Sequence, residues 1–484
     1  MEILDRLIDG DGRLRIGGER ITASDGSGID VLDPATAEVI TAVASAGPAD
    51  AADAIDAADS AAVSWSDTAP RERGEILRRA YELMVNRANE FAELIVLEMG
   101  KSFVESRGEV LYAAEFFRWF SEESVRNIGT IQLSPSGDKR ILSIDQPVGV
   151  SLLITPWNFP AAMVTRKIGP ALAAGCTMIL KPASDTPLTA LAMTDLLSEA
   201  GLPDGVVNVI PSNRSSMIVP KILADPRVRK LSFTGSTEVG KILLREAGSH
   251  VVNCSMELGG NSPFIVFDDA DIEAAVEGAM IAKMRNGGQS CVAANRLYVH
   301  ESVRDEFSRA FVTAMEEVQL GPGMDPGVDL GPLVNFSAQQ DMSEFVGSST
   351  ASGSTVAAGG RAPDSPGFFY LPTVLTEVGN DDPILSQEIF GPVAPIVTFE
   401  SEDEVISMAN DTVHGLASYL YTNDLTKGMR VSEAIESGMV GLNRGVFSDP
   451  AAPFGGVKQS GIGREGAHVG MLEFLETKYI AADW

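Results

Sequence analysis

The sequence is poor in cysteine, in histidine and in positive charge. Its three cysteines cannot form a disulfide framework in a chain of 484 residues, so a reducing cytoplasm is the simplest environment for it. Its four histidines show no spacing typical of a metal site, and no metal is expected. A formal net charge of -30 would repel nucleic acids and anionic membranes, so neither is expected as a partner.

Long apolar runs are missing as well. No stretch approaches the roughly 20 residues that span a bilayer. The acidic start, MEILDRLIDGDGR, lacks the basic and apolar regions of a signal peptide. We therefore expect a cytoplasmic protein. The acidity is spread along the chain, which fits a solubilising surface, adaptation to a salty cytoplasm or a GC-rich genome, and the sequence leaves this choice open.

Short β-rich segments alternate with helical patterns over most of the chain. A first series contains VGVSLLI (148–154), TMILK (177–181), GVVNVI (205–210) and KLSFTG (230–235). A second series contains PFIVF (263–267), RLYVH (296–300), APIVTF (394–399), SYLYT (418–422) and MVGLN (439–443). This alternation predicts right-handed crossovers and a parallel, doubly wound sheet. Two series predict two α/β domains that meet near residues 259–260.

Other segments carry weaker signals. Residues 1–50 contain short strands with a turn at Asp33-Pro34. Apolar residues at helical spacing predict one helix from Pro70 to Met99, with Thr68 and Pro70 suited to its start and Gly100 to its end. Residues 126–147 alternate around Ser-Pro-Ser-Gly and predict a hairpin arm, which we expect to pair with another subunit.

Cys291 is the strongest candidate for a nucleophile. It lies in RNGGQSCVAANR, where two glycines and two small polar residues precede it. A lone cysteine is usually an inert core residue, and the apolar neighbours of Cys176 and Cys254 fit that interpretation. The approach to Cys291 does not, so we expect its thiol at the bottom of a pocket.

Two polar residues in rigid or apolar settings complete a candidate catalytic set. Glu257 lies between Met256 and Leu258 and precedes two glycines, so desolvation should raise its pKa towards the range of a general base. Asn158 lies between two prolines in ITPWNFP, and a rigidly held amide can donate to a developing oxyanion. A solvent-facing carboxylate and an ordinary Asx turn are equally good interpretations of each residue alone.

Phosphate-binding signals are indirect, since no G-x-G-x-x-G follows a first strand. FTGSTEVG (233–240) follows a strand and opens a helix, and a helix N-terminus with free N–H groups attracts anions. LKPAS (180–184) ends another strand with Lys181, which could reach a ribose or a phosphate.

Together these motifs closely resemble the aldehyde dehydrogenase superfamily over nearly the whole chain. ITPWNFP, LKPAS, FTGSTEVG, MELGG, GGQSC, EIFGP and PFGGVKQSG occur in the family's order and spacing. The resemblance is closest to the succinate-semialdehyde dehydrogenase branch, from MVTRK through FIVFDDADIEAAVEGA to GREGAHVGMLEFLETKY.

The resemblance implies oxidation of an aldehyde to a carboxylic acid through a thioester on Cys291. Asn158 and the Cys291 N–H would hold the oxyanion, and Glu257 would activate water. It implies NADP as cofactor, with NAD possible, because many NAD-preferring relatives carry Glu where this chain has Ser184. The expected cofactor contacts are Thr155, Pro156, Trp157, Lys181, Ser184, Gly235, Ser236, Glu388 and Phe390.

A substrate carboxylate would need cations, and the resemblance places Arg166, Arg285 and Ser448 around it, with the neighbouring Asp449 as a complication. Succinate semialdehyde is the expected substrate. Glutarate semialdehyde, 2-oxoglutarate semialdehyde, a simple aliphatic aldehyde and an inert structural protein of the same fold remain alternatives. Glu257 favours hydrolysis over transfer to coenzyme A, and Ala293 stands where some relatives carry a second, regulatory cysteine.

The implied fold is a doubly wound cofactor-binding domain, a second α/β catalytic domain and a small β oligomerisation arm. We expect residues 1–125 and 148–259 in the first domain, 260–445 in the second, and 446–470 as a segment that returns to the first. The arm would comprise residues 126–147 and 471–484 and would join the chains into a homodimer or homotetramer.

Overall fold

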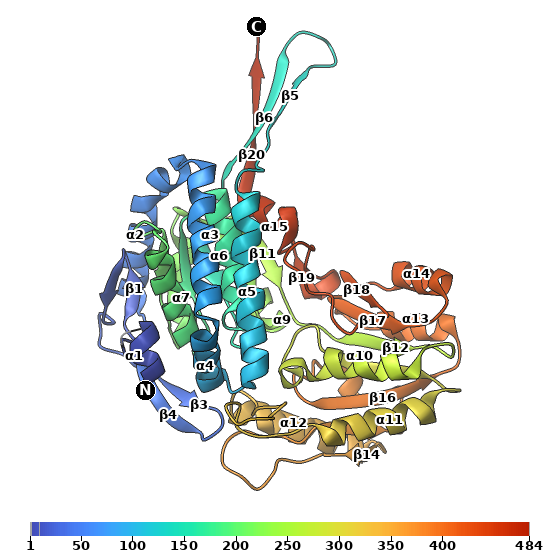
Figure 1. Cartoon of the computed structure of the whole chain (residues 1–484). Coiled ribbons are helices and arrows are strands. Elements are labelled where there is room, and N and C mark those ends of the chain that lie inside the picture. The colour runs from blue at the N-terminus through green and yellow to red at the C-terminus, as the bar shows by residue number, and fades with distance from the viewer. Residues whose placement is uncertain (1, 9, 484) are drawn as a thin grey trace.

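The structure is a computed structural model that describes residues 2–8 and 10–483. Two separate sheets, each covered by helices on both faces, form the body, and a narrow β arm projects from it (Figure 1). This confirms the predicted doubly wound α/β architecture with a second α/β unit. No helix within the described residues is long and apolar enough to cross a membrane.

The first sheet has eight strands, and its five central neighbours run parallel. In spatial order they are β19 (Gly461–Ile462), β11 (Asn253–Glu257), β10 (Val228–Thr234), β7 (Val150–Ile154), β8 (Met178–Lys181), β9 (Val207–Val209), β1 (Leu14–Ile16) and β2 (Glu19–Ile21). The chain order runs outwards in both directions from β7. The crevice between the carboxyl ends of β7 and β10 is therefore the switch point at which such sheets bind ligands.

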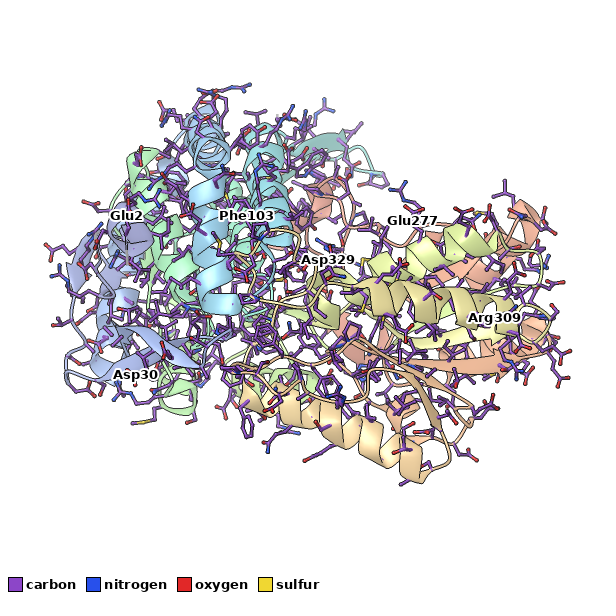
Figure 2. The ribbon with its side chains drawn as sticks, turned by 60° about the horizontal axis from the view of Figure 1, so that its bottom comes forward. Glu2, Asp30, Phe103, Glu277, Arg309 and Asp329 are labelled. Carbon is purple, nitrogen blue, oxygen red and sulfur yellow. The ribbon has the colours of Figure 1, made fainter. Side chains whose placement is uncertain are left out.

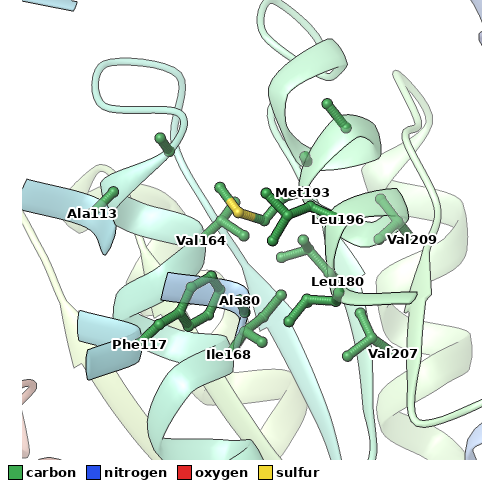
Figure 3. Close-up of a cluster of buried hydrophobic side chains, with 14 of the residues drawn as sticks. Ala80, Ala113, Phe117, Val164, Ile168, Leu180, Met193, Leu196, Val207 and Val209 are labelled. Atoms are coloured by element: carbon green, nitrogen blue, oxygen red, sulfur yellow. The ribbon is translucent and has the colours of Figure 1, made fainter. Parts of the chain in front are cut away.

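Alternate residues of these strands face opposite helical layers, because successive side chains of a strand point to opposite faces. Leu153 and Leu180 pack against α3 (Pro70–Asn86), α4 (Ala88–Met99), α5 (Phe103–Glu123), α6 (Ala162–Ala174) and α7 (Leu188–Glu199). Figure 3 shows part of this layer, with Phe117 and Ile168 close to Leu180. Leu152 and Ile179 pack against α2 (Pro48–Asp67), α8 (Ser215–Ala224) and α9 (Thr237–Gly248).

The second sheet has seven strands, all parallel except for the edge pair. In spatial order they are β14 (Thr355–Ala358), β15 (Thr373–Thr376), β16 (Val393–Phe399), β13 (Ala294–His300), β12 (Ser262–Val266), β17 (Ala417–Tyr421) and β18 (Met439–Leu442). One face carries α10 (Ile272–Met284) and α11 (Arg304–Glu317), and the other carries α12 (Phe336–Ala351), α13 (Glu402–Asn410) and α14 (Leu425–Ala434).

The arm consists of β5 (Thr130–Leu133), β6 (Arg140–Pro147) and β20 (Leu475–Ala482), in the order β20-β6-β5. Its hairpin was expected from the sequence, and the C-terminal strand pairs with β6 along its whole length. Large apolar side chains of the arm are exposed, including Ile131 at 62% and Tyr479 at 55%. Oligomerisation through this arm stays a prediction.

The remaining elements are short. They are α1 (Glu2–Ile8), β3 (Gly28–Asp33), β4 (Glu38–Ala44), α15 (Ala467–Leu472) and three 3-10 turns, η1 (Arg285–Gly288), η2 (Pro383–Ser386) and η3 (Lys458–Ser460).

Two expectations near the N-terminus were wrong. The single helix expected from Pro70 to Met99 is two helices, because Arg87 leaves helical geometry at φ -105° and ψ 20°. Thr68 belongs to the end of α2, where its hydroxyl donates to the carbonyl of Ser64. Helix α1 was missed within the strands expected for residues 1–50. Its apolar residues at helical spacing, such as Leu4 and Ile8, are buried against the core.

Candidate active site

A pocket of about 220 Å³ opens where the carboxyl ends of β7, β10 and β11 meet the loop that follows α10. It brings together all three candidate catalytic residues, Cys291, Glu257 and Asn158. Its lining also includes Pro156, Trp157, Met163, Thr234, Gly235, Ser236, Leu258, Gly259, Glu388 and Phe390. Six of the nine expected cofactor contacts therefore share this pocket with the expected nucleophile.

The loop before Cys291 has an unusual backbone. Asn286, Gly287 and Gly288 adopt left-handed φ values of 54°, 61° and 76°. At Gly288 a Cβ atom would lie 2.2 Å from the carbonyl oxygen of Gly391, so the two glycines allow a close approach as well as the turn. The thiol of Cys291 is partly buried, and burial raises its pKa to about 12. The thiol is therefore protonated at neutral pH, and its addition to a carbonyl requires a base.

Glu257 ends β11 and is buried. Burial raises its pKa well above the usual range, and the charge of Glu465 adds to this, whereas Arg166 and Lys167 oppose it. The prediction of a desolvated carboxyl is thus confirmed. Its Oε2 has no hydrogen-bond partner within residues 2–8 and 10–483, so the atom is free to accept a proton from a thiol or a water molecule.

Asn158 is buried, and its amide is held next to the cysteine loop. Its Nδ2 donates to the carbonyl of Gln289 over 3.0 Å, two residues before Cys291. An amide nitrogen carries two protons, so one stays available for an oxyanion. The backbone N–H of Cys291 makes no hydrogen bond within the described part of the chain. Two donors can therefore converge beside the thiol.

The crevice at the switch point carries a helix N-terminus, a buried hydroxyl and two aromatic rings. Ser236 is the N-cap of α9, and its hydroxyl accepts from the N–H of Val239, so the free amides of this helix end face the pocket that Ser236 lines. The hydroxyl of Thr234 lines the same pocket, and it is buried without a partner among the described residues. Trp157 and Phe390 meet edge to face at 5.5 Å and form one wall.

Glu388 lines the pocket, whereas Lys181 lies outside its lining. Glu388 accepts from the N–H of Gly260, and burial raises its pKa to about 7. Lys181 ends β8 and donates to the carbonyl of Pro182, and burial lowers its pKa to about 8. Ser184 follows in the same loop and is partly exposed, and buried Thr155 donates its N–H to the carbonyl of Lys181. Lys181, Ser184 and Thr155 lie outside the pocket lining.

The two expected substrate arginines differ in their surroundings. Arg166 lies on α6, is buried, and places Nη2 2.8 Å from Oε2 of Glu465. Its guanidinium also lies 3.9 Å above the ring of Phe454. Arg285 lies over the rings of Phe159 and Tyr112, at 5.1 and 5.7 Å, and has no ion pair within residues 2–8 and 10–483.

Ser448 and Arg285 line a small hollow together with Ser290 and Val292, the neighbours of Cys291. Asp449 is exposed and accepts from the N–H of Ala451, so its carboxylate is turned towards its own loop. A larger cavity, about 950 Å³, is a separate groove outside the cysteine pocket. Phe103 and Asp329, both labelled in Figure 2, line it, and Arg285 contributes to its wall.

Sequence reasoning missed three residues of this region. Glu465 pairs with both Arg166 and Lys167, and the Lys167 Nζ lies 2.7 Å from it. The ring of Tyr112 lies 5.7 Å from the guanidinium of Arg285, and the charges of both arginines act on its hydroxyl. Burial raises the pKa of Tyr112, and the arginines oppose this rise. No local pattern could have indicated these contacts, since 298 residues separate Lys167 from Glu465.

Comparisons with known proteins agree with this arrangement. The model of the aldehyde dehydrogenase family matches residues 21–480. A succinate-semialdehyde dehydrogenase of Paenarthrobacter nicotinovorans is 55% identical over 87% of this chain and 94% of its own. The succinate-semialdehyde dehydrogenase [NADP(+)] of Escherichia coli K12 and a glutarate-semialdehyde dehydrogenase of Pseudomonas aeruginosa are each 46% identical over 96% of both chains.

A solved structure of succinate-semialdehyde dehydrogenase from Burkholderia pseudomallei superimposes with a TM-score of 0.96. It is 45% identical and covers 97% of this chain and 98% of its own. The resemblance drawn from the sequence motifs, including its closeness to the succinate-semialdehyde branch, is confirmed by these matches. The chain belongs to the aldehyde dehydrogenase family.

Proposed function

We propose that this aldehyde dehydrogenase oxidises succinate semialdehyde to succinate with NADP or NAD. The observation that carries the proposal is the convergence of Cys291, Glu257 and Asn158 on one pocket, with the unpaired cation Arg285 on the adjoining hollow. The overall reaction consumes the aldehyde, water and the oxidised cofactor, and it yields the acid, the reduced cofactor and a proton.

The chain's own residues supply the nucleophile, the base and the oxyanion donors. Glu257, whose pKa burial raises, takes the proton of the Cys291 thiol, which adds to the aldehyde carbon. The Asn158 amide and the Cys291 N–H stabilise the oxyanion that forms. When bound, the nicotinamide cofactor supplies the hydride acceptor. Glu257 releases the thiol proton to solvent before it deprotonates the water that hydrolyses the thioester on Cys291, and the proton taken from this water returns to the departing thiolate.

A substrate carboxylate would meet unequal partners in the two arginines. Arg166 shares the carboxylate of Glu465 with Lys167, and its Nε and Nη2 have no hydrogen-bond partner among the described residues, so its charge is compensated only in part. Arg285 lies over two aromatic faces and its charge also acts on the nearby carboxyl of Glu105, but it makes no ion pair within the described residues, and a cation of this kind favours an incoming anion. We therefore assign the main charge recognition to Arg285, with Ser448 and Arg166 as the other contacts.

Cofactor choice is proposed to favour NADP at least as much as NAD. Ser184 puts no negative charge where a 2′-phosphate would be repelled, and Lys181, with a pKa of about 8, is mostly protonated at neutral pH. In the same proposal Ser236 and Gly235 face the pyrophosphate, Glu388 binds the nicotinamide ribose, and Trp157 with Phe390 encloses the ring. Pro156 lines the pocket, and the neighbouring Thr155, outside this lining, completes the proposed cofactor contacts.

A second candidate substrate is glutarate semialdehyde, because a relative of that name is as similar to this chain as the Escherichia coli one. A substrate panel decides between them. It compares kcat/KM for the semialdehydes of succinate, glutarate and 2-oxoglutarate with that for butanal, with NADP and with NAD. Equal kcat/KM for butanal and succinate semialdehyde would refute the proposal of a carboxylate site.

We also propose that the arm joins copies of this chain into a homodimer or homotetramer. In the same proposal residues 1–125 and 148–259 form the cofactor-binding domain, residues 260–445 the catalytic domain, and residues 446–470 return to the first domain. The exposed apolar side chains of β5 and β20 support this proposal, since such surfaces usually mark contacts between proteins. Light scattering on the full chain and on an Ile131→Lys, Leu133→Lys variant tests it. A variant with unchanged mass would count against the arm as the contact.

A further inference from the structure

We propose that a buried ion pair, Lys101 with Glu109, positions Asn158 for the oxyanion, and that both are positioning residues for thiol addition. The inference rests on the proposed function, because it concerns the placement of the proposed oxyanion donor. Lys101 follows the end of α4, and Glu109 lies on α5. Both side chains are 1% exposed and in direct contact.

Lys101 holds one end of the loop that carries Asn158. Its Nζ donates to the backbone carbonyl of Asn158 over 2.8 Å, in addition to its bond with Glu109. The ammonium also lies 4.2 Å above the ring of Phe159, the next residue. The carbonyl and the side-chain amide of Asn158 belong to the same residue, so fixing the first restricts the second.

Glu109 holds the other end of this loop. Its Oε2 contacts Lys101, and its Oε1 accepts from the N–H groups of Ala161 and Ala162 over 2.9 and 3.2 Å. These amides open α6, whose N-cap residue, Ala161, has no side chain that could cap it. One carboxylate thus caps the helix and binds the cation that fixes Asn158.

A second set of contacts ties the cysteine loop to the same helix. Glu105 lies one turn before Glu109 on α5 and accepts from the N–H of Asn286 over 2.7 Å. Asn286 then donates its Nδ2 to the carbonyls of both Asn158 and Gln289. The α5 helix therefore sets the separation between the Asn158 amide and Cys291.

Stability alone accounts poorly for this pair. Removing one partner of a buried ion pair is strongly destabilising, whereas replacing both by neutral groups of similar volume is often tolerated. The pair uses its remaining hydrogen-bonding capacity on the Asn158 loop and on the start of α6. Positioning of the Asn158 amide explains why the ion pair makes its further hydrogen bonds with the Asn158 loop and with the start of α6.

The test uses the double variant Lys101→Met, Glu109→Gln in the full chain. It removes both charges and the donor to Asn158, but Gln keeps an oxygen that can accept from Ala161. We expect the rate of the pre-steady-state burst of reduced cofactor to fall about ten- to hundredfold, because small misplacements of catalytic groups have effects of this size. The loss should be equal for succinate semialdehyde and butanal, with little change in KM.

Alkylation of Cys291 by iodoacetamide separates positioning from general damage. Alkylation is a displacement at a saturated carbon and forms no oxyanion. The alkylation rate of the double variant should therefore stay within about twofold of the wild-type rate. Glu98→Gln is the matched control. Glu98 is also buried, and it accepts from the first amides of a helix, Leu188 and Thr189 of α7, which carries no site residue. Its burst should be unchanged. Lys101→Gln, Glu109→Gln, which also removes both charges, gives the same comparison if the first double variant does not fold.

A wild-type burst in the double variant would overturn the inference. Equal falls in the burst rate and in the alkylation rate would also overturn it, because the Lys101–Glu109 pair would then support the structure of the whole site. Either result leaves the proposed function intact. A wild-type chain that produces a burst with butanal and none with succinate semialdehyde would refute the proposed substrate, while the comparison of variants on butanal would still decide the inference.

Discussion

Arg166 and Glu465 contact each other beside the active-site pocket, with Nη2 of the arginine 2.8 Å from Oε2 of the glutamate. The arginine expected to bind a substrate carboxylate thus already has an acidic partner. Glu465 also raises the pKa of Glu257, whereas Arg166 lowers it. A change at Arg166 therefore reaches the proposed base as well as the substrate, which is not the case for Arg285.

Arg285→Ala should impair succinate semialdehyde selectively. A charge-assisted contact to a carboxylate is worth roughly 1.5–3 kcal/mol, about a ten- to hundredfold loss in kcat/KM. The kcat/KM of this variant for butanal should change little. Arg166→Ala, the comparison variant, should lower kcat/KM for both substrates, because it leaves Glu465 with Lys167 alone. Equal losses on both aldehydes for Arg285→Ala would show that this arginine is structural.

Cys291→Ala should abolish dehydrogenase activity, because no other described cysteine shares the pocket. Cys254→Ala is the control and should retain the wild-type rate, since that thiol is on β11 outside the pocket lining. Cys176→Ala should also keep the chemistry. Turnover by the Cys291→Ala protein at the wild-type rate would refute the mechanism.

Glu257→Gln should form the thioester and hydrolyse it slowly. Without the base, thiol addition depends on the thiolate that exists at the working pH. The thiol has a pKa of about 12, so the thiolate fraction grows about tenfold per pH unit below that value. The burst rate of the variant should therefore rise steeply between about pH 7 and pH 9, and that of the wild type should rise less. A variant with an unchanged steady-state rate would exclude Glu257 as the base.

Ser184→Glu should lower kcat/KM for NADP and leave that for NAD nearly unchanged, because a carboxylate would repel the 2′-phosphate and accept from ribose hydroxyls. Ser184→Ala is the matched control without added charge and should change both values little. Initial rates at varied cofactor concentration measure this. A wild-type chain with a much higher kcat/KM for NAD would already show that Ser184 is not a sufficient determinant.

Lys283→Met should stabilise the protein at neutral pH. The ammonium is fully buried, its one polar contact among the described residues is with Asn295 at 3.5 Å, and burial lowers its pKa to about 7. A base with a lowered folded-state pKa destabilises the fold most at low pH, and stability increases as the pH rises from about 7 to about 10.5. We expect a gain on the order of 2 kcal/mol at pH 7, after the loss of the Asn295 contact.

Thermal unfolding at pH 7 and at pH 10 measures this gain, which should shrink at the higher pH. The exposed Lys241 provides the control, since Lys241→Met changes the same charge without a burial cost. A Lys283→Met protein less stable than wild type at pH 7 would contradict the expectation.

Much of the fold could be predicted because its signals are local. Strand segments such as 148–154 and 263–267 are short apolar runs between turns, and each became a strand close to the expected bounds. The helix boundary at Arg87 was missed, because apolar spacing continues across it and the break lies in the backbone conformation of Arg87.

The catalytic candidates could also be found in the chain itself, because glycines, prolines and apolar neighbours next to Cys291, Asn158 and Glu257 already restrict what these side chains can do. Their partners could not. Glu465 contacts Arg166, and Lys101 with Glu109 holds Asn158, through contacts between segments far apart in the chain. An ion pair needs two side chains within a few ångströms, and for distant residues only the packing of helices on the sheet brings them that close.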